Sequence, residues 1–235
     1  IRLAYDDALE YYCQIQGSGS KLRDEALSKL IEYYAAATTT TTASSDESES
    51  SNQQHQVTVF NSVSWDRREV VELPSGVQGA QKIEGTEKYL AIVEAPSVGY
   101  QVQSCDMTLS DELSISESSN DEYIVMENRF VSVSIDVSKG TLTVFDKRAN
   151  RIAVRDGNQF TMFDDVPLFW DAWDVEFYHL NKPAKVNLPS SVSIKERGHL
   201  RVSVEIVTPI TDKSTITQHI QLTAVSPRID FVTHV

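Results

Sequence analysis

The feature that most constrains the fold of this chain is a change in the spacing of its apolar residues. Within residues 1–37 apolar side chains recur every three or four positions, and from Val57 onward they recur every second position. The clearest example is residues 131–137, VSVSIDV, where all the apolar side chains fall on one face of a strand. The sequence therefore predicts a helical beginning followed by sheets that bury one face.

The first 37 residues predict two helices. One apolar stripe at helical spacing consists of Ile1, Ala4, Tyr5, Ala8, Tyr12 and Ile15. Residues 17–19, Gly-Ser-Gly, are expected to end this helix, and Ser20 is a suitable N-cap for the next one. We expect an αα-hairpin over residues 1–37. Two amphipathic helices cannot bury both apolar faces on each other, so the hairpin is expected to be the end of a larger helical bundle.

Residues 38–56 have a different composition, dominated by Thr, Ser, Asp and Glu, with no large aliphatic or aromatic side chain. Such a segment buries too little apolar surface to offset the entropy lost on ordering. It is predicted to be a disordered linker. Its acidic serines suggest phosphorylation sites as an alternative to a simple solvated spacer.

Residues 57–235 predict an antiparallel β-sandwich. A turn at residues 138–140 joins two alternating runs within residues 129–146, and further runs begin near Leu200, Thr217 and Ile229. Helical periodicity is almost absent from this part, which argues against a βαβ fold. The last run reaches the end of the sequence without a closing turn, so the sandwich is expected to be incomplete, truncated at its C-terminus.

Composition limits the partners and the location. The net charge is −13 and the pI is about 4.8, which disfavours binding to nucleic acid or to an anionic membrane surface. No apolar run is long enough to span a bilayer, and the N-terminus lacks a secretory signal pattern. No Asn-x-Ser/Thr acceptor is present. We expect a cytoplasmic or vacuolar protein that is not classically secreted.

Reactive and aromatic residues are densest in residues 158–179, which interrupt the alternation. The candidate residues, substrate-adjacent or at a domain interface, are Asp165, Trp170, Asp171, Trp173, Asp174, Tyr178 and His179. Their groups suit acid–base work, metal ligation or stacking against sugars, and the residues alone do not select among these. Asp171, Asp174 and His179 match no recognised metal-ligand spacing. An aromatic-acidic loop that anchors one domain against another is the structural alternative.

Four stretches, taken in order, resemble the β-rich portion of glycoside hydrolase family 38 α-mannosidases, in their cytosolic or fungal vacuolar-type branch. The stretches are residues 59–74, VFNSVSWDRREVVELP; residues 95–100, APSVGY; residues 126–130, MENRF; and residues 158–179. The last one is the longest and most specific. Residues 1–7 resemble the bundle helix that follows the family's final metal-binding histidine region, and residues 38–56 resemble a lineage-specific insertion.

The resemblance implies a retaining exo-α-mannosidase that hydrolyses terminal α-mannosides of oligosaccharides. It also implies an aspartate nucleophile, a carboxylic general acid and a divalent metal, zinc or cobalt, held by aspartates and histidines upstream of Ile1. We therefore expect no catalytic residue and no metal ligand in this chain, which alone should be inactive. The implied partners are the remaining domains of the same polypeptide, namely a catalytic α/β domain and the rest of the bundle and sandwich, together with a mannose-containing oligosaccharide.

A second reading from a different functional class is a non-catalytic carbohydrate-binding or structural β-sandwich module. In that reading Trp170 and Trp173 hold a sugar or a neighbouring domain without any chemistry. A Ca²⁺-dependent adhesion sandwich would also suit the acidic composition, but the sequence contains no repeat of calcium ligands.

Overall fold

The computed structural model describes residues 2–39, 56–105, 112–166, 168–170, 173, 175–182 and 185–235. The chain divides into two compact units, Ile1–Gln53 and Gln54–Val235. Each unit is described by itself. The predicted linker at residues 38–56 lies almost entirely outside the described residues, as do Asp171 and Asp174 of the candidate site.

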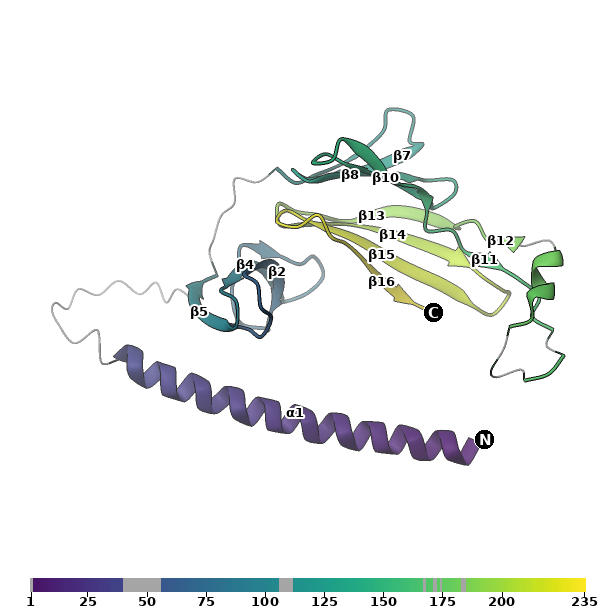
Figure 1. Cartoon of the computed structure of the whole chain (residues 1–235). Coiled ribbons are helices and arrows are strands. Elements are labelled where there is room, and N and C mark those ends of the chain that lie inside the picture. Colours follow the sequence, from purple (N-terminus) through teal and green to yellow (C-terminus); the bar gives the residue numbers. More distant parts are fainter. Residues whose placement is uncertain are drawn as a thin grey trace. The chain divides into compact units, whose positions relative to one another are not determined.

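The first unit contains one continuous helix, α1 (Arg2–Thr39), so the predicted break into a hairpin was wrong (Figure 1). Gly17 and Gly19 both lie inside the helix, and neither has the positive φ that a glycine following a helix usually adopts. A glycine inside a helix costs only about 0.5–1 kcal/mol relative to alanine, which good helix formers on both sides offset. No described helix is long and apolar enough to cross a membrane.

The second unit consists of antiparallel sheets. The five-stranded sheet, in the order β10-β9-β8-β7-β6, is formed by β6 (Ser114–Glu117), β7 (Tyr123–Glu127), β8 (Val131–Asp136), β9 (Leu142–Asp146) and β10 (Arg151–Gly157). The four-stranded sheet, β13-β14-β15-β16, is formed by β13 (Ser191–Arg197), β14 (Arg201–Pro209), β15 (Thr215–Thr223) and β16 (Ile229–His234). All pairings among the described strands are antiparallel, which confirms the predicted mainly β class.

These two sheets pack face to face and form the predicted β-sandwich (Figure 1). Their shared core contains Met126, Val133 and Ile135 from one sheet and Val204, Ile220 and Leu222 from the other, among further apolar residues. The predicted hairpin within residues 129–146 is confirmed, because β8 and β9 pair from Val131↔Asp146 to Ile135↔Leu142. Gly140 in its turn has a φ of 68°, a conformation that suits glycine.

Residues 56–105 form two smaller sheets. One pairs β1 (Gln56–Asn61) with β5 (Gly99–Ser104), and the other has the order β2-β4-β3, with β2 (Arg67–Leu73), β3 (Gln81–Lys82) and β4 (Tyr89–Ala95). Strand β4 is buried on both faces: Leu90 and Ile92 pack with Leu200 and Ala224 beside the four-stranded sheet, while Ala91 packs with Leu73 and Cys105. The three-stranded sheet is thereby joined to the sandwich through an apolar contact.

Candidate functional site

The candidate residues lie on an excursion from the sandwich, here called the aromatic-acidic segment, residues 158–182. Its root is closed by a short pair of strands, β11 (Thr161–Met162) and β12 (Lys185–Val186) (Figure 1). Between them lies a single turn of 3₁₀ helix, η1 (Phe177–Asn181). The segment therefore leaves the sandwich and returns to it at the same place, as compact functional loops do.

The entry to the segment is fixed by Asn158, which the sequence analysis did not select as a site residue. Asn158 has a φ of 65°, which asparagine tolerates better than most residues. Its side-chain amide donates to the carbonyl oxygen of Gly140 at 3.3 Å and to Oε1 of Gln218 at 2.9 Å. These hydrogen bonds tie the start of the segment to both sheets of the sandwich.

Two tryptophans of the segment are held side by side with their rings in solvent. Trp170 is 73% exposed and Trp173 is 87% exposed, and their ring centroids lie 6.5 Å apart at an interplanar angle of 54°. The backbone N–H of Trp173 donates to the carbonyl oxygen of Trp170 at 2.7 Å. Trp170 has a φ of 60°, a strained conformation for a bulky residue, and such strain is often retained at binding sites.

The tryptophans belong to a larger exposed apolar surface. Its other members in the segment are Phe163, Val166, Leu168, Phe169, Val175, Phe177, Tyr178 and Leu180. Scattered exposed apolar residues need no explanation, but this many in one short excursion is typical of a surface that meets a ligand or another protein surface.

Tyr178 and His179 lie at the foot of the segment. The ring of Tyr178 lies 4.2 Å from that of Phe177, and the ring of His179 meets Phe163 edge-on at 5.1 Å. Nδ1 of His179 lies 2.7 Å from the carbonyl oxygen of Glu176. Because a carbonyl oxygen only accepts, Nδ1 is the donor of this hydrogen bond.

The acidic candidates are less completely described. Asp165 is exposed, and its neighbour Asp164 forms a 3.5 Å ion pair with Lys182. Within the described residues no group of three or more His, Cys, Asp or Glu side chains is arranged to hold a metal ion. A zinc-type site needs three or four such ligands, so the described donor set does not fit a zinc or cobalt ion.

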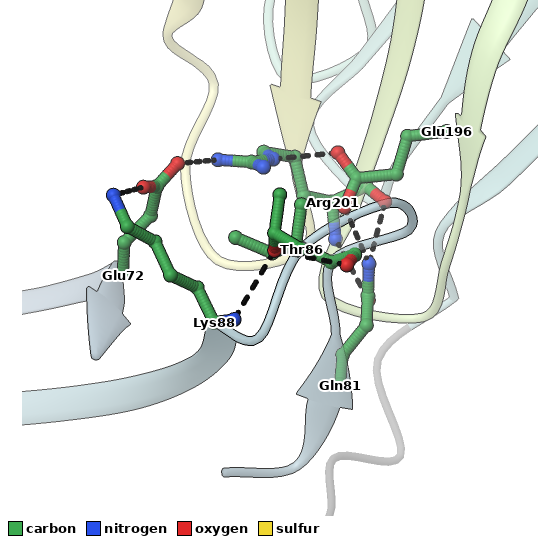
Figure 2. A network of polar contacts seen from close by, with 7 residues as sticks. Glu72, Gln81, Thr86, Lys88, Glu196 and Arg201 are labelled. Atoms are coloured by element: carbon green, nitrogen blue, oxygen red, sulfur yellow. Dashed lines mark hydrogen bonds and ion pairs between the residues drawn. The ribbon is translucent and has the colours of Figure 1, made fainter. Parts of the chain in front are cut away.

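A second polar cluster, not anticipated from the sequence, joins β2 and β3 to β13 and β14 (Figure 2). Arg201 donates from Nε to Glu196 at 2.7 Å and from a terminal nitrogen to Glu72 at 2.9 Å. Gln81 donates to Glu196 at 2.9 Å and accepts from the backbone N–H of Leu200 at 2.7 Å. Apart from the Arg201–Glu196 pair, these contacts link residues more than 100 positions apart, which explains why sequence spacing gave no signal.

Two pKa values in this cluster are shifted. The hydrogen bond from Arg201 lowers the pKa of Glu72, and although partial burial opposes it, the charges of Arg201 and Lys88 add to the lowering. Burial by itself would lower the pKa of Arg201, but the hydrogen bonds to Glu196 and Glu72 raise it overall. The side chains of Glu72, Gln81, Glu196 and Arg201 thus serve as hydrogen-bond partners for one another.

Comparison with known proteins agrees with the resemblance seen in the sequence. Residues 126–235 match the glycosyl hydrolases family 38 C-terminal domain. The chain is 28% identical to mouse alpha-mannosidase 2C1 over all of its length and 21% of the relative's, and 30% identical to human alpha-mannosidase 2C1 over 75% of the chain and 17% of the relative. It is 29% identical to the alpha-mannosidase of Saccharomyces cerevisiae over 51% of the chain and 12% of the relative.

The chain thus spans about a fifth or less of the length of these curated relatives. The matched family region includes β8, β14, β15 and the aromatic-acidic segment, so the sandwich core and the candidate site both lie within it. Residues 126–235 therefore belong to glycosyl hydrolase family 38, in the C-terminal region of its α-mannosidases.

Proposed function

We propose that this chain works within a longer polypeptide, as part of the C-terminal region of a retaining, metal-dependent exo-α-mannosidase that removes terminal α-mannosides from oligosaccharides. The family match and the names of the relatives support this activity. A retaining mechanism needs two carboxyl groups roughly 5 Å apart on either side of the glycosidic bond. In the proposal these groups and the metal ligands come from domains outside this chain.

Within that enzyme, the aromatic-acidic segment borders the groove that receives the oligosaccharide. The observation that carries this assignment is the exposed Trp170–Trp173 pair, held by a backbone hydrogen bond in a strained turn. Aromatic faces suit the C–H surfaces of sugars, and covering one exposed indole contributes roughly 2–3 kcal/mol. Asp165, Asp171 and Asp174 would accept hydrogen bonds from sugar hydroxyls, while Tyr178 and His179 support the foot of the segment.

The segment's assignment is tested by substitution in the longest natural polypeptide that contains this sequence. We expect Trp173→Ala and Asp174→Asn to lower kcat/KM for an aryl α-mannoside at least tenfold without changing the melting temperature. Trp65→Ala is the matched control, because Trp65 is also exposed but lies outside the segment. Normal turnover combined with early melting in both segment variants would instead identify the segment as an anchor between domains.

A separate assay tests the proposal that the nucleophile and the metal ligands lie outside this chain. The 235-residue chain should hydrolyse no aryl α-mannoside, with or without added zinc or cobalt. Measurable turnover by the chain that disappears with a chelator would overturn the proposal that the nucleophile and metal ligands lie elsewhere. The same assay on the longer polypeptide provides the positive control.

A further inference from the structure

A polar pocket lies on the outer face of the four-stranded sheet, away from the sandwich core. It has a volume of about 300 Å³, and its walls include Lys195, Ser203, Glu205, His219 and Gln221, with Ile83 and Glu84 at one side. In the register of β14 and β15, Ser203 pairs with Gln221 and Glu205 pairs with His219, so these four side chains share one face. The volume is at the lower end of the roughly 300–1,000 Å³ typical of ligand pockets.

One polar group at this pocket, the hydroxyl of Ser203, lacks a hydrogen-bond partner among the described residues. Ser203 is 2% exposed, and its hydroxyl oxygen is fully buried without a hydrogen-bond partner among the residues that the structure describes. Burying an unpaired hydroxyl costs about 1–3 kcal/mol, so native proteins nearly always provide a partner for it. Ser203 is one of the residues that line the pocket, so a rotation of its side chain about χ1 would bring the hydroxyl to a group bound there.

Most of the charged groups around the pocket are already paired with one another. One carboxylate oxygen of Glu205 pairs with Lys195 at 2.9 Å, and the other lies 3.6 Å from Nε2 of His219. Arg201 is similarly paired with Glu196 at 2.7 Å. An anion would meet carboxylates, and a metal ion would find no group of three suitable ligands among the described residues. The pocket thus disfavours both kinds of ion.

The groups that remain available are neutral and both donate and accept hydrogen bonds. They are the hydroxyl of Ser203, the side-chain amide of Gln221 and Nδ1 of His219, the ring nitrogen that does not face Glu205. Hydroxyl groups of a sugar ring also donate and accept, and they carry no charge. We propose that this pocket binds a single neutral hexose ring, with a sugar hydroxyl hydrogen-bonded to Ser203. The residues that line this pocket are not part of the aromatic-acidic segment. The hexose site and the proposed role of that segment can therefore be tested independently.

The test is an NMR titration of the ¹⁵N-labelled 235-residue chain with D-mannose and D-glucose, using glycerol as a small polyol control. We expect saturable shifts of the amide signals of Ser203, His219 and Gln221 with at least one hexose, at millimolar affinity, and no saturation with glycerol. If an α-linked mannobiose shifts the same signals more tightly than the free hexose, the ligand is the end of an oligosaccharide. Shifts confined to Trp170 and Trp173 would support the proposed function and refute the pocket.

Ser203→Ala separates a ligand site from a structural hydroxyl. The variant should lose at least fivefold in hexose affinity while its melting temperature stays the same or rises, because an unpaired buried hydroxyl has been removed. Ser193→Ala is the matched control, an exposed serine on the neighbouring strand β13 that does not line the pocket. Unchanged affinity, or a lowered melting temperature in Ser203→Ala, would overturn the proposal. If Ser203→Ala does not fold, Gln221→Leu is measured in its place and must also lose affinity.

Discussion

Gln81 of β3 lies directly against Gly198 in the turn between β13 and β14, so closely that a β-carbon at position 198 would overlap the Gln81 side-chain amide. That amide is buried and immobilised, because it donates to Glu196 and to the carbonyl oxygen of Arg201 and accepts from two backbone N–H groups. Gly198 does not have a positive φ, so glycine is required here by the close approach of Gln81 and not by backbone conformation.

Gly198→Ala should therefore lower the free energy of unfolding by about 2–4 kcal/mol, because the Gln81 amide must move and lose several buried hydrogen bonds. Urea denaturation of the chain measures the loss. Gln81→Ala is destabilising too, but in that background Gly198→Ala should cost less than about 1 kcal/mol, since the clash is gone. Additive losses in this double-mutant cycle would mean that the two residues do not restrict each other.

Removing the positive charge of Arg201 should destabilise the chain strongly. The side chains of Arg201 and Glu196 are each only 11% exposed in their ion pair. Arg201→Met leaves Glu196 buried without its partner, which costs about 3–5 kcal/mol. Arg228→Met is the matched control, because Arg228 pairs with Asp230 and Glu69 at an exposed position and should change stability by less than about 1 kcal/mol. Equal effects in thermal or urea melts would contradict the assigned role of the buried pair.

The pH dependence of stability should include a contribution from Glu72. Its pKa is lowered from 4.5 by the hydrogen bond from Arg201, so the folded state favours the ionised carboxylate. The contribution is fully present above this ordinary pKa of 4.5 and is lost as the pH falls through the lower pKa of the folded state. Because Glu72 is nearly half exposed, we expect less than about 1 kcal/mol.

The measurement compares the chain with its Glu72→Gln variant at pH 7 and at pH 3. The chain should be more stable than Glu72→Gln at pH 7, and the difference should shrink at pH 3. Glu87→Gln serves as a control, because Glu87 forms only an exposed pair with Lys82. If the stability difference between the chain and Glu72→Gln grew as the pH fell, the folded state would favour the protonated carboxyl group, contrary to this prediction.

Asn128 should tolerate no change of its side-chain amide. It is 1% exposed and makes four hydrogen bonds: it donates to the carbonyl oxygens of Thr223 and Ser226 at 2.8 Å each and accepts from the N–H groups of Phe130 and Val131. Asn128→Asp keeps the shape but places a carboxyl oxygen against two carbonyl oxygens. We expect a loss of at least about 3 kcal/mol at pH 7, whereas Asn120→Asp, at an exposed turn, should be nearly neutral. Equal melting temperatures for the two variants would show that the buried hydrogen bonds of Asn128 do not contribute to stability.

The strands of the sandwich were predictable because burial on one face imposes a period of two on the sequence. Val133 and Ile135, and likewise Val204 and Ile206, alternate with polar residues and all lie in the shared core. The aromatic-acidic segment could also be located, since it interrupts this alternation. Of its acidic residues, Asp164 and Asp165 are exposed, while Asp171 and Asp174 lie outside the described residues.

What sequence spacing could not reveal are contacts between distant positions. Gln81 belongs to a strand of only two residues, too short for any periodic signal, yet its amide joins two sheets. Ser203 occupies an ordinary outward position of β14, and only the pocket around it distinguishes it from other strand serines. The helical hairpin was predicted wrongly for a related reason: two glycines favour a turn locally, but their cost is small against the length of a 38-residue helix.

Substitution of Gly17 distinguishes a continuous helix from a hairpin. Gly17 lies inside α1, and nothing beyond its own turns of the helix lies within 4 Å of where its β-carbon would be. Gly17→Ala should therefore raise the helical circular dichroism signal and stabilise the helix by about 0.5–1 kcal/mol. If the chain instead turned at residues 17–19, Gly17 would need a positive φ, and alanine would destabilise it by a similar amount. Gly17→Pro should interrupt the continuous helix and provides the reference for lost helicity, and the sign of the alanine effect decides between the two arrangements.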